Sequence, residues 1–232
     1  MRYACRCPRD SPDSVITPTR KSATMRRMSM ATPAPVNTSS RGAQRKMQII
    51  SVAAGLFNER GYHETSMDLI AAHVGIRKAS LYHYFSSKDE ILIVIHEEMI
   101  DLIIERQEDR VAAATLGPRD MLLAVMTDLV TLMESHPGHL RVFFEHYREL
   151  PEEARQAIAG KRDHYHGMLI KILDDGVRAG DFGPMDTRMT SFAILGMCNW
   201  TYQWFHPGEG WTAEQVARHF WQLFIDGTAP KP

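Results

Sequence analysis

The sequence has little cysteine and no long uninterrupted run of apolar residues. A helix that spans a bilayer needs about 20 consecutive apolar residues, so we expect no membrane association. The three cysteines, Cys5, Cys7 and Cys198, form neither a disulfide framework nor a zinc-ligand pattern. Such sparse cysteine is typical of a reducing compartment, and we therefore predict a cytoplasmic protein without a bound metal.

Recognisable catalytic motifs are missing as well. The eleven histidines fall into no H-E-x-x-H motif and no nucleophile–base–orienter pattern, and the chain has no phosphate-binding loop. His139, Glu145 and His146 lie close together in the sequence but match none of these patterns. We therefore predict that the protein is not an enzyme and uses no cofactor.

Charge is distributed unevenly along the chain. Residues 1–88 carry 14 Lys and Arg against 5 Asp and Glu, a net of +9, whereas residues 89–232 carry 13 against 23, a net of −10. A basic front joined to an acidic body is typical of a nucleic-acid-binding segment attached to a domain with another role.

Residues 1–40 contain many Arg, Ser, Thr and Pro residues, only two acids and no helical period, which predicts a disordered extension. The composition also resembles an organellar transit peptide. We prefer the simpler interpretation that translation begins at Met25, Met28 or Met30.

From Arg41 onward the apolar residues recur at helical spacing, and no segment alternates like a β-strand. We predict an all-α fold of about nine helices, with a DNA-binding domain over 41–88 and a ligand-binding and dimerisation domain over 89–232. Two boundaries have capping signals, because Thr65 precedes Asp68 and Ser87 precedes Glu90 by three residues. The predicted helices run from Arg41 to the stop at Gly61, from Thr65 to Gly75, from Arg77 to Tyr84, from Ser87 towards Ala113, from Pro118 to Ser135, from Pro137 to Leu150, from Pro151 to near Gly180, over 186–205 and over 212–226.

Residues 61–92 carry the most informative pattern, GYHETSMDLIAAHVGIRKASLYHYFSSKDEIL. Two short helices meet at Gly75, and the second is rich in cationic and hydroxyl-bearing residues. This is the layout of a helix-turn-helix, in which one helix braces the other in the major groove. An amphipathic three-helix unit with incidental lysines is the weaker alternative, since capping, turn glycine and charge all agree.

Over Arg41–Leu92 the motif resembles the TetR family of bacterial transcriptional regulators. The resemblance implies a homodimer on double-stranded DNA with a palindromic operator, most simply a repressor released by a small-molecule effector, although an activator stays possible. Arg77 stands where the family has a small capping residue, and it either contacts phosphate or guanine or is a solvated surface charge. The predicted DNA-binding residues are Thr65, Ser66, Arg77, Lys78, Ala79, Ser80, Tyr82, His83 and Lys88.

The chemistry of these side chains fits the same role. Lys78 neutralises phosphate and releases counterions, and the N-termini of helices offer N–H donors to anions. Tyr82 and His83 donate to phosphates or reach base edges, while the small Ala79 allows a close approach to the groove floor. A purely structural helical adaptor would explain the apolar helices but not this basic segment.

The segment 186–205 is apolar on nearly all sides, so both of its sides must be covered. We expect one side to pack on the body of the protein and the other on a second subunit. One face is formed by Met189, Phe192, Ala193, Gly196, Met197, Trp200 and Trp204, and Ile194, Leu195, Cys198, Tyr202 and Phe205 cover much of the rest; either face could meet the partner.

Aromatic residues on two of the predicted helices suggest a ligand pocket, although the same residues could simply fill the core. Residues 196–227 also resemble a TetR subgroup of fatty-acid and steroid-catabolism repressors, and that resemblance implies an acyl-CoA effector; a hydrophobic effector without CoA is the alternative. The candidate ligand-binding residues are Phe144, Tyr147, Arg162, His166, Trp200 and Trp204.

Overall fold

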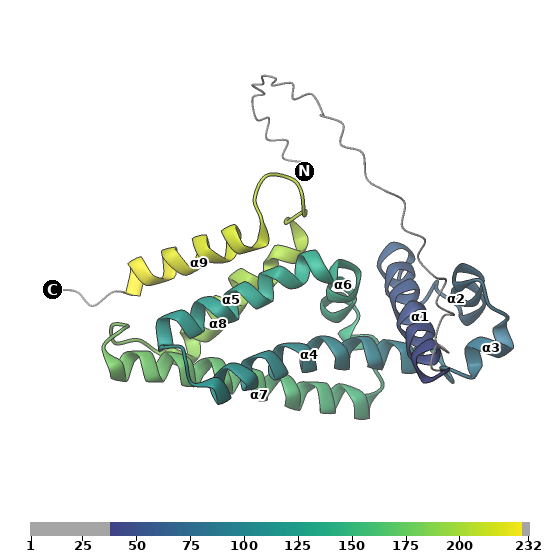
Figure 1. Ribbon diagram of the computed structural model, residues 1–232, viewed down its shortest axis with the longest axis horizontal. Helices are drawn as coiled ribbons and strands as arrows, with labels where there is room; N and C mark the ends of the chain where they lie inside the picture. The colour runs from purple at the N-terminus through teal and green to yellow at the C-terminus, as the bar shows by residue number, and fades with distance from the viewer. Residues whose placement is uncertain (1–37, 229–232) are drawn as a thin grey trace, which may run out of the picture. The chain divides into compact units, whose positions relative to one another are not determined.

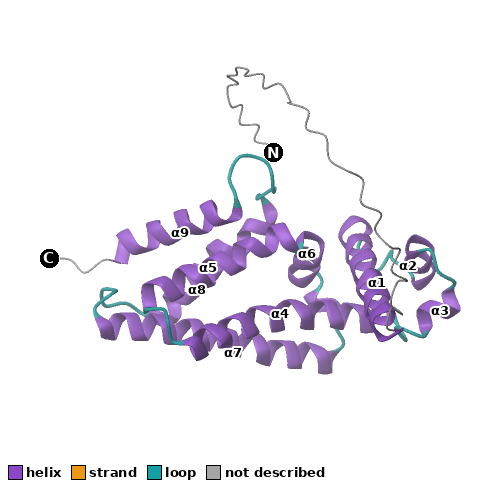
Figure 2. Cartoon of the chain, viewed as in Figure 1, coloured by secondary structure: helices purple, strands orange, loops and turns teal. Residues whose placement is uncertain are grey.

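The computed structural model describes residues 38–228, and the predicted disordered extension therefore lies almost entirely outside the described residues. Within them the chain forms nine α-helices, two short 3₁₀ helices and no strand, which confirms the predicted all-α fold (Figure 2). The helices are α1 (Thr38–Arg60), α2 (Met67–Val74), α3 (Lys78–Tyr82), α4 (Lys88–Ala113), α5 (Pro118–Ser135), α6 (Pro137–Glu145), η1 (Tyr147–Glu149), α7 (Glu152–Ala179), α8 (Thr187–Trp200), η2 (Thr201–Gln203) and α9 (Ala213–Thr228).

Local signals in the sequence explain most of the helix ends. Gly75 ends α2 with a left-handed backbone at φ +75°, a conformation that glycine adopts without strain. The Ser87 hydroxyl caps α4 by accepting from the Glu90 backbone N–H at 3.1 Å. The Glu90 carboxylate accepts from the N–H of Ser86, one residue earlier than a regular capping box requires. The caps therefore fix the short connections on both sides of α3.

Several predicted helix boundaries were wrong. α2 is capped by Ser66, whose hydroxyl accepts from the Leu69 N–H at 3.2 Å, and not by Thr65. The helix that was expected to run from Pro137 to Leu150 stops at Glu145, and η1 follows it. α3 is also shorter than expected, since it begins after Arg77 and ends at Tyr82.

The first three helices form one group, and α4 leads from it to the remaining helices (Figure 1). α1 packs on α2, α4 and α6, while α4 packs on α6 and α7, and α5 packs on α7 and α9. Apolar side chains from all of these helices join in one continuous buried core. The group of α1–α3 is therefore attached to the rest of the described chain through α4 and α6.

Candidate nucleic-acid interface and effector pocket

α3 has one buried side and one exposed side. Leu81 and, just beyond the helix, Phe85 are almost fully buried and fasten the segment to the core. Lys78, Ala79 and His83 are exposed. Tyr82 is 46% exposed. Ser80 is half-buried between the two sides. The helix thus presents a cation, a phenol and an imidazole around a small residue, a set suited to phosphates and base edges.

Lys78 has a carboxylate partner in the free protein. Its ammonium donates to the Asp68 carboxylate of α2 at 2.9 Å, and this hydrogen bond raises the pKa of Lys78. Both side chains are more than half exposed, and such surface pairs contribute little to stability. Lys78 is therefore free to exchange Asp68 for a DNA phosphate. Arg77, beside it, is exposed and has no ion-pair partner among the described residues.

Thr65 is hydrogen-bonded inside the protein. The side chain is fully buried, and its hydroxyl donates to the carbonyl oxygen of Gly61 at 2.9 Å. Its backbone N–H donates to the carbonyl oxygen of Tyr62 at 3.3 Å. Both groups that were expected to meet a phosphate are therefore used inside the protein, and the phosphate contact of Thr65 stays a prediction. The neighbouring Ser66 is exposed at the start of α2.

Lys88 is likewise engaged inside the protein. Its ammonium donates to the carbonyl oxygens of Tyr62 at 2.9 Å and Thr65 at 3.2 Å, and it approaches that of His63 at 3.4 Å. The same group lies 4.3 Å from the centroid of the Tyr62 ring. Three carbonyls match the three protons of the ammonium, which gives Lys88 a structural role, and its phosphate contact stays a prediction. Lys88 ties the loop between α1 and α2 to the start of α4.

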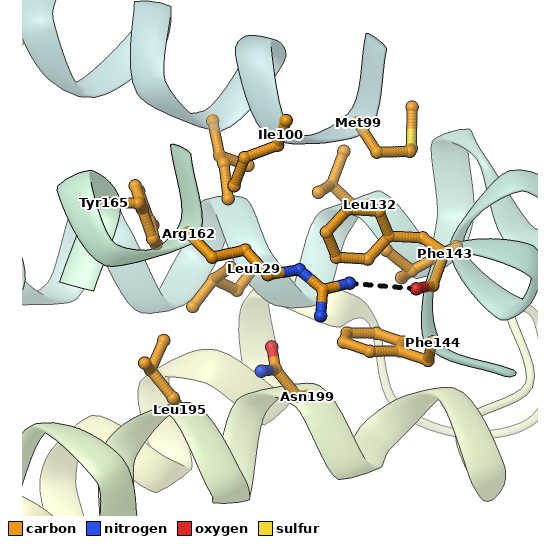
Figure 3. A pocket seen from close by; sticks show the side chains of 12 residues that line it. Met99, Ile100, Leu129, Leu132, Phe143, Phe144, Arg162, Tyr165, Leu195 and Asn199 are labelled. Atoms are coloured by element: carbon orange, nitrogen blue, oxygen red, sulfur yellow. Dashed lines mark hydrogen bonds between the residues drawn. The ribbon is translucent and has the colours of Figure 1, made fainter. Parts of the chain in front are cut away.

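A pocket of about 160 Å³ lies among α4, α5, α6, α7 and α8 (Figure 3). Its wall is apolar apart from Arg162 and Asn199, with the phenol of Tyr165 at one side. Among the predicted ligand-binding residues, Phe144 and Arg162 line it. The lining residues are Met99, Ile100, Ile103, Leu129, Leu132, Leu140, Phe143, Phe144, Arg162, Tyr165, Leu195 and Asn199.

Arg162 is held between aromatic rings. Its guanidinium carbon lies 4.3 Å from the ring centroid of Phe143 and 4.1 Å from that of Tyr147. One terminal nitrogen donates to the Phe143 carbonyl oxygen at 3.1 Å (Figure 3). The Nε atom is buried and has no acceptor among the described residues. Burial lowers the pKa of Arg162, but a guanidinium keeps its charge in proteins. The pocket wall thus contains a buried N–H donor without an acceptor on a cation.

Three predicted ligand residues lie elsewhere. Trp200 is 62% exposed and Trp204 is 40% exposed, and neither lines the pocket. His166 is hydrogen-bonded to the Ser191 hydroxyl at 2.6 Å, and its ring lies 4.3 Å from that of Phe192, outside the lining. The orientation of α8 explains the place of Trp200, because this helix turns Leu195 and Asn199 towards the pocket and Trp200 outward, while Trp204 lies beyond η2.

Sequence reasoning missed most of the pocket wall. Met99, Ile100 and Ile103 of α4 recur at helical spacing, as do Leu129 and Leu132 of α5. A solid core produces the same spacing, so no sequence signal separates a lined cavity from a filled one. Asn199 was a hint, since it is a polar residue in the apolar second half of α8.

The segment α6–η1 touches both the pocket and the α1–α3 group. Phe143 and Phe144 line the pocket. His146 Nε2 lies 3.3 Å from the carbonyl oxygen of Phe57 in α1. Glu149 of η1 is paired with His63 at 2.9 Å. A displacement of this segment would therefore be felt at both places.

One row of apolar side chains on α8 is uncovered. Met189 is 67%, Phe192 52% and Trp200 62% exposed, and Leu223 of α9 is 57% exposed. Ala193 and Gly196 lie exposed on the same helix, whereas Ile194 and Cys198 are fully buried. The exposed row contains most of the residues that were predicted to share one face of this segment.

Among residues 38–228, no helix combines the length and apolar character needed to cross a bilayer. No group of three or more His, Cys, Asp or Glu side chains in this part of the chain is arranged to hold a metal ion.

Two short helices meet at a glycine turn and present an exposed cationic face. One long helix joins them to an all-α body that contains a pocket. This arrangement defines a helix-turn-helix transcriptional regulator.

Comparison with known proteins identifies the family. Residues 49–95 match the model of bacterial regulatory proteins of the tetR family, and residues 115–228 match the tetracyclin repressor-like C-terminal domain. The solved structure of AibR in complex with isovaleryl coenzyme A and operator DNA has a TM-score of 0.69 and 30% identity, over 77% of this chain and 97% of that one. The chain belongs to the TetR family and is a DNA-binding transcriptional regulator.

Two curated relatives agree with the predicted subgroup. The transcriptional repressor KstR2 of Rhodococcus jostii is 26% identical over 85% of this chain and 98% of its own length. The fatty acid metabolism regulator protein of Bacillus subtilis is 26% identical over 78% of this chain and 94% of its own length. These relatives are transcriptional regulators, as the helix-turn-helix motif predicted.

Proposed function

We propose that the protein is a homodimeric cytoplasmic repressor, not an enzyme, that leaves a palindromic operator when an acyl-CoA thioester binds. Residues 41–88 would form its DNA-binding domain and residues 89–232 its effector-binding and dimerisation domain. The observation that carries this proposal is the placement of Arg162. This half-buried cation, whose buried Nε has no acceptor, lines an apolar pocket, and the segment that packs on it also contacts the α1–α3 group.

The size of the pocket favours a short acyl group. Its volume of about 160 Å³ is close to the roughly 150 Å³ of an engineered apolar cavity that binds benzene. An acyl chain of about five to eight carbons fits such a space, whereas a fused steroid ring system requires a larger one. Arg162 Nε would donate to the thioester carbonyl oxygen. The isovaleryl coenzyme A bound to AibR, a relative at 30% identity, supports this class of ligand.

The exposed apolar row of α8 and α9 supports the dimer. Large contiguous apolar patches are rare on monomeric proteins and mark sites of association. A twofold axis through this row would place two copies of α3 on one face of the dimer. Recognition helices read successive major grooves when their half-sites lie about one helical turn apart, roughly 34–36 Å.

Effector and DNA need only prefer different conformations to be coupled. A ligand in the pocket pushes on Phe143 and Phe144 of α6, and the contacts of His146 and Glu149 transmit the displacement to α1 and to the loop before α2. The two copies of α3 would then lose the spacing that the operator requires.

A release experiment tests the proposal. Operator DNA selected from random duplexes is labelled, and its anisotropy with the dimer is followed while isovaleryl-CoA or octanoyl-CoA is added. We expect release by the thioesters, and we expect Arg162→Leu to bind the operator normally but to need at least about tenfold more thioester, which corresponds to the loss of one charge-assisted hydrogen bond. Arg148→Leu, an exposed arginine of η1, is the matched control and should behave like wild type. If free hydrophobic acids or neutral compounds release the DNA and thioesters do not, the effector class is wrong.

A further inference from the structure

A second apolar cavity lies at the far end of α4 from the α1–α3 group, between α4, the start of α5 and α7. Its volume is about 430 Å³, and it shares no lining residue with the effector pocket. Val111 is 53% and Leu116 38% exposed at this site, and Met121 and Met168 also line it. We call it the Gln107 groove, after the polar side chain in its wall.

Gln107 carries an unused hydrogen-bond donor. The residue is 1% exposed, and its amide nitrogen has no acceptor among the described residues. Its amide oxygen accepts from Arg110 at 3.4 Å. Rotating the amide by half a turn would bring its NH₂ group against the guanidinium, donor facing donor. The amide nitrogen therefore points away from Arg110, and an acceptor from outside the chain would satisfy it.

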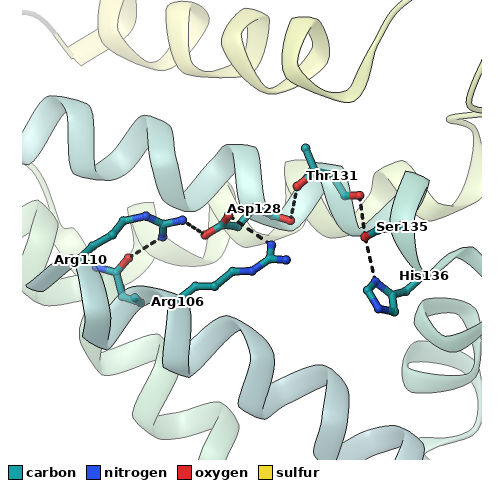
Figure 4. Close-up of polar contacts among 7 residues, drawn as sticks. Arg106, Arg110, Asp128, Thr131, Ser135 and His136 are labelled. Carbon is teal, nitrogen blue, oxygen red and sulfur yellow. Dashed lines mark hydrogen bonds and ion pairs between the residues drawn. The ribbon is translucent and has the colours of Figure 1, made fainter. Parts of the chain in front are cut away.

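The charges around the groove favour an anion. Arg106 and Arg110 share one carboxylate, that of Asp128 in α5 (Figure 4). In α7, Lys171 at 2.8 Å and Arg178 at 2.7 Å share the single carboxylate of Asp175, and Lys171 and Asp175 both line the groove.

Each cluster holds two cations and one anion, so each keeps an excess positive charge. Glu108, the acid next to Gln107 in the sequence, is paired with His164 instead. An anion placed beside Gln107 therefore meets excess positive charge from two helices.

We propose that the Gln107 groove binds a medium-chain carboxylic acid as the free anion. Its carboxylate accepts from Gln107 Nε2 beside Arg110, and its alkyl chain covers the exposed side chains of Val111 and Leu116. At roughly 30 Å³ for each water-sized group, the volume accommodates on the order of ten to fourteen heavy atoms, which corresponds to an acid of about ten carbons. This site is separate from the effector pocket, and its occupancy does not depend on the thioester proposal.

Methionine-methyl NMR of the full chain tests the groove with decanoate, below its micelle concentration. Met121 and Met168 report the groove, and Met99 reports the effector pocket. We expect decanoate to shift the methyl signals of Met121 and Met168. Decan-1-ol, which has the same chain length without the charge, should bind at least about tenfold more weakly.

Two variants and a control complete the test. Gln107→Leu removes the amide nitrogen that has no partner, at the cost of one long hydrogen bond from Arg110, so we expect an intact fold and at least about tenfold weaker decanoate binding at Met121. Gln156→Leu, at an exposed position of α7, should leave this affinity unchanged. Met168→Trp would fill the groove and abolish the response of Met121, which keeps the test decisive if Gln107→Leu does not fold.

Three results would overturn the proposal. A shift of Met99 alone would place decanoate in the effector pocket and remove the groove site. Gln107→Leu could bind decanoate as tightly as wild type, or decan-1-ol could match decanoate. Either of the last two outcomes would reduce the groove to an apolar surface without acid recognition.

Discussion

His96 should make the protein sensitive to mild acid. The side chain is fully buried in α4, its Nδ1 atom is hydrogen-bonded to the Leu92 carbonyl oxygen at 2.9 Å, and its Nε2 atom has no partner among the described residues. Its ring packs on those of Phe143 and Tyr147. Burial lowers its pKa from 6.5 to about 4, and the nearby positive charge of Arg162 adds to the effect.

The direction of the pH dependence follows from this lowered pKa. The folded protein keeps His96 neutral, whereas the unfolded chain binds a proton below pH 6.5. The stabilising contribution is therefore fully present above about pH 6.5 and is lost as the pH falls towards 4. Linkage gives a loss of about 2 kcal/mol in the free energy of unfolding between pH 7 and pH 5, and about 3 kcal/mol by pH 4.

Urea unfolding at fixed protein concentration measures this loss. Other groups also titrate between pH 7 and pH 5, so the comparison is with His96→Leu, which should lose about 2 kcal/mol less than wild type over the same interval. His219→Leu removes an exposed imidazole and should follow wild type. Equal pH slopes for wild type and His96→Leu would refute the reasoning about the buried ring.

Four further predictions concern the DNA-binding and dimer surfaces. Tyr82→Ala should weaken operator binding at least tenfold, about 1.4 kcal/mol, while its free energy of unfolding changes by less than about 0.5 kcal/mol; a comparable loss of folding in urea titrations would make Tyr82 a packing residue. Lys78→Ala should flatten the log–log salt dependence of operator binding by about 0.9 unit for each half-site, and an unchanged slope would mean that the lysine stays with its carboxylate partner. Thr65→Val should cost about 1 kcal/mol of folding stability, because a buried hydroxyl loses its hydrogen bonds, and should leave the salt slope intact; the opposite pattern would establish Thr65 as a phosphate contact. Trp200→Glu should give a folded monomer in light scattering, whereas Val111→Glu, a comparably exposed site on α4, should stay dimeric; a Trp200→Glu dimer would place the subunit interface elsewhere.

The sequence predicted the fold well because the helix ends carry local signals. Pro118 begins α5, Gly75 ends α2 and Ser87 caps α4, and each of these residues acts through its own backbone or side chain. The end of α6 was missed for the same reason. No glycine, proline or capping residue marks Glu145, and the break into η1 depends on packing against other helices.

The candidate sites were harder to predict because side-chain roles depend on long-range contacts. Family resemblance pointed to Lys88 as a phosphate contact, but the loop that folds back over it supplies three carbonyl acceptors. Trp200 was expected in the pocket since aromatic residues often line cavities. The rotation of α8 that turns it outward is set by the packing of Ile194 and Cys198, and sequence periodicity does not fix that angle.

Selection of bound duplexes from random DNA at moderate ionic strength tests the central claim most directly, namely that the exposed face of α3 reads a major groove. We predict enrichment of an inverted repeat whose half-sites lie about 10–10.5 base pairs, or a multiple of this distance, apart, and we predict that Tyr82→Ala loses the enrichment. Enrichment of no sequence, or of an asymmetric sequence that the Tyr82→Ala protein binds equally well, would contradict the account.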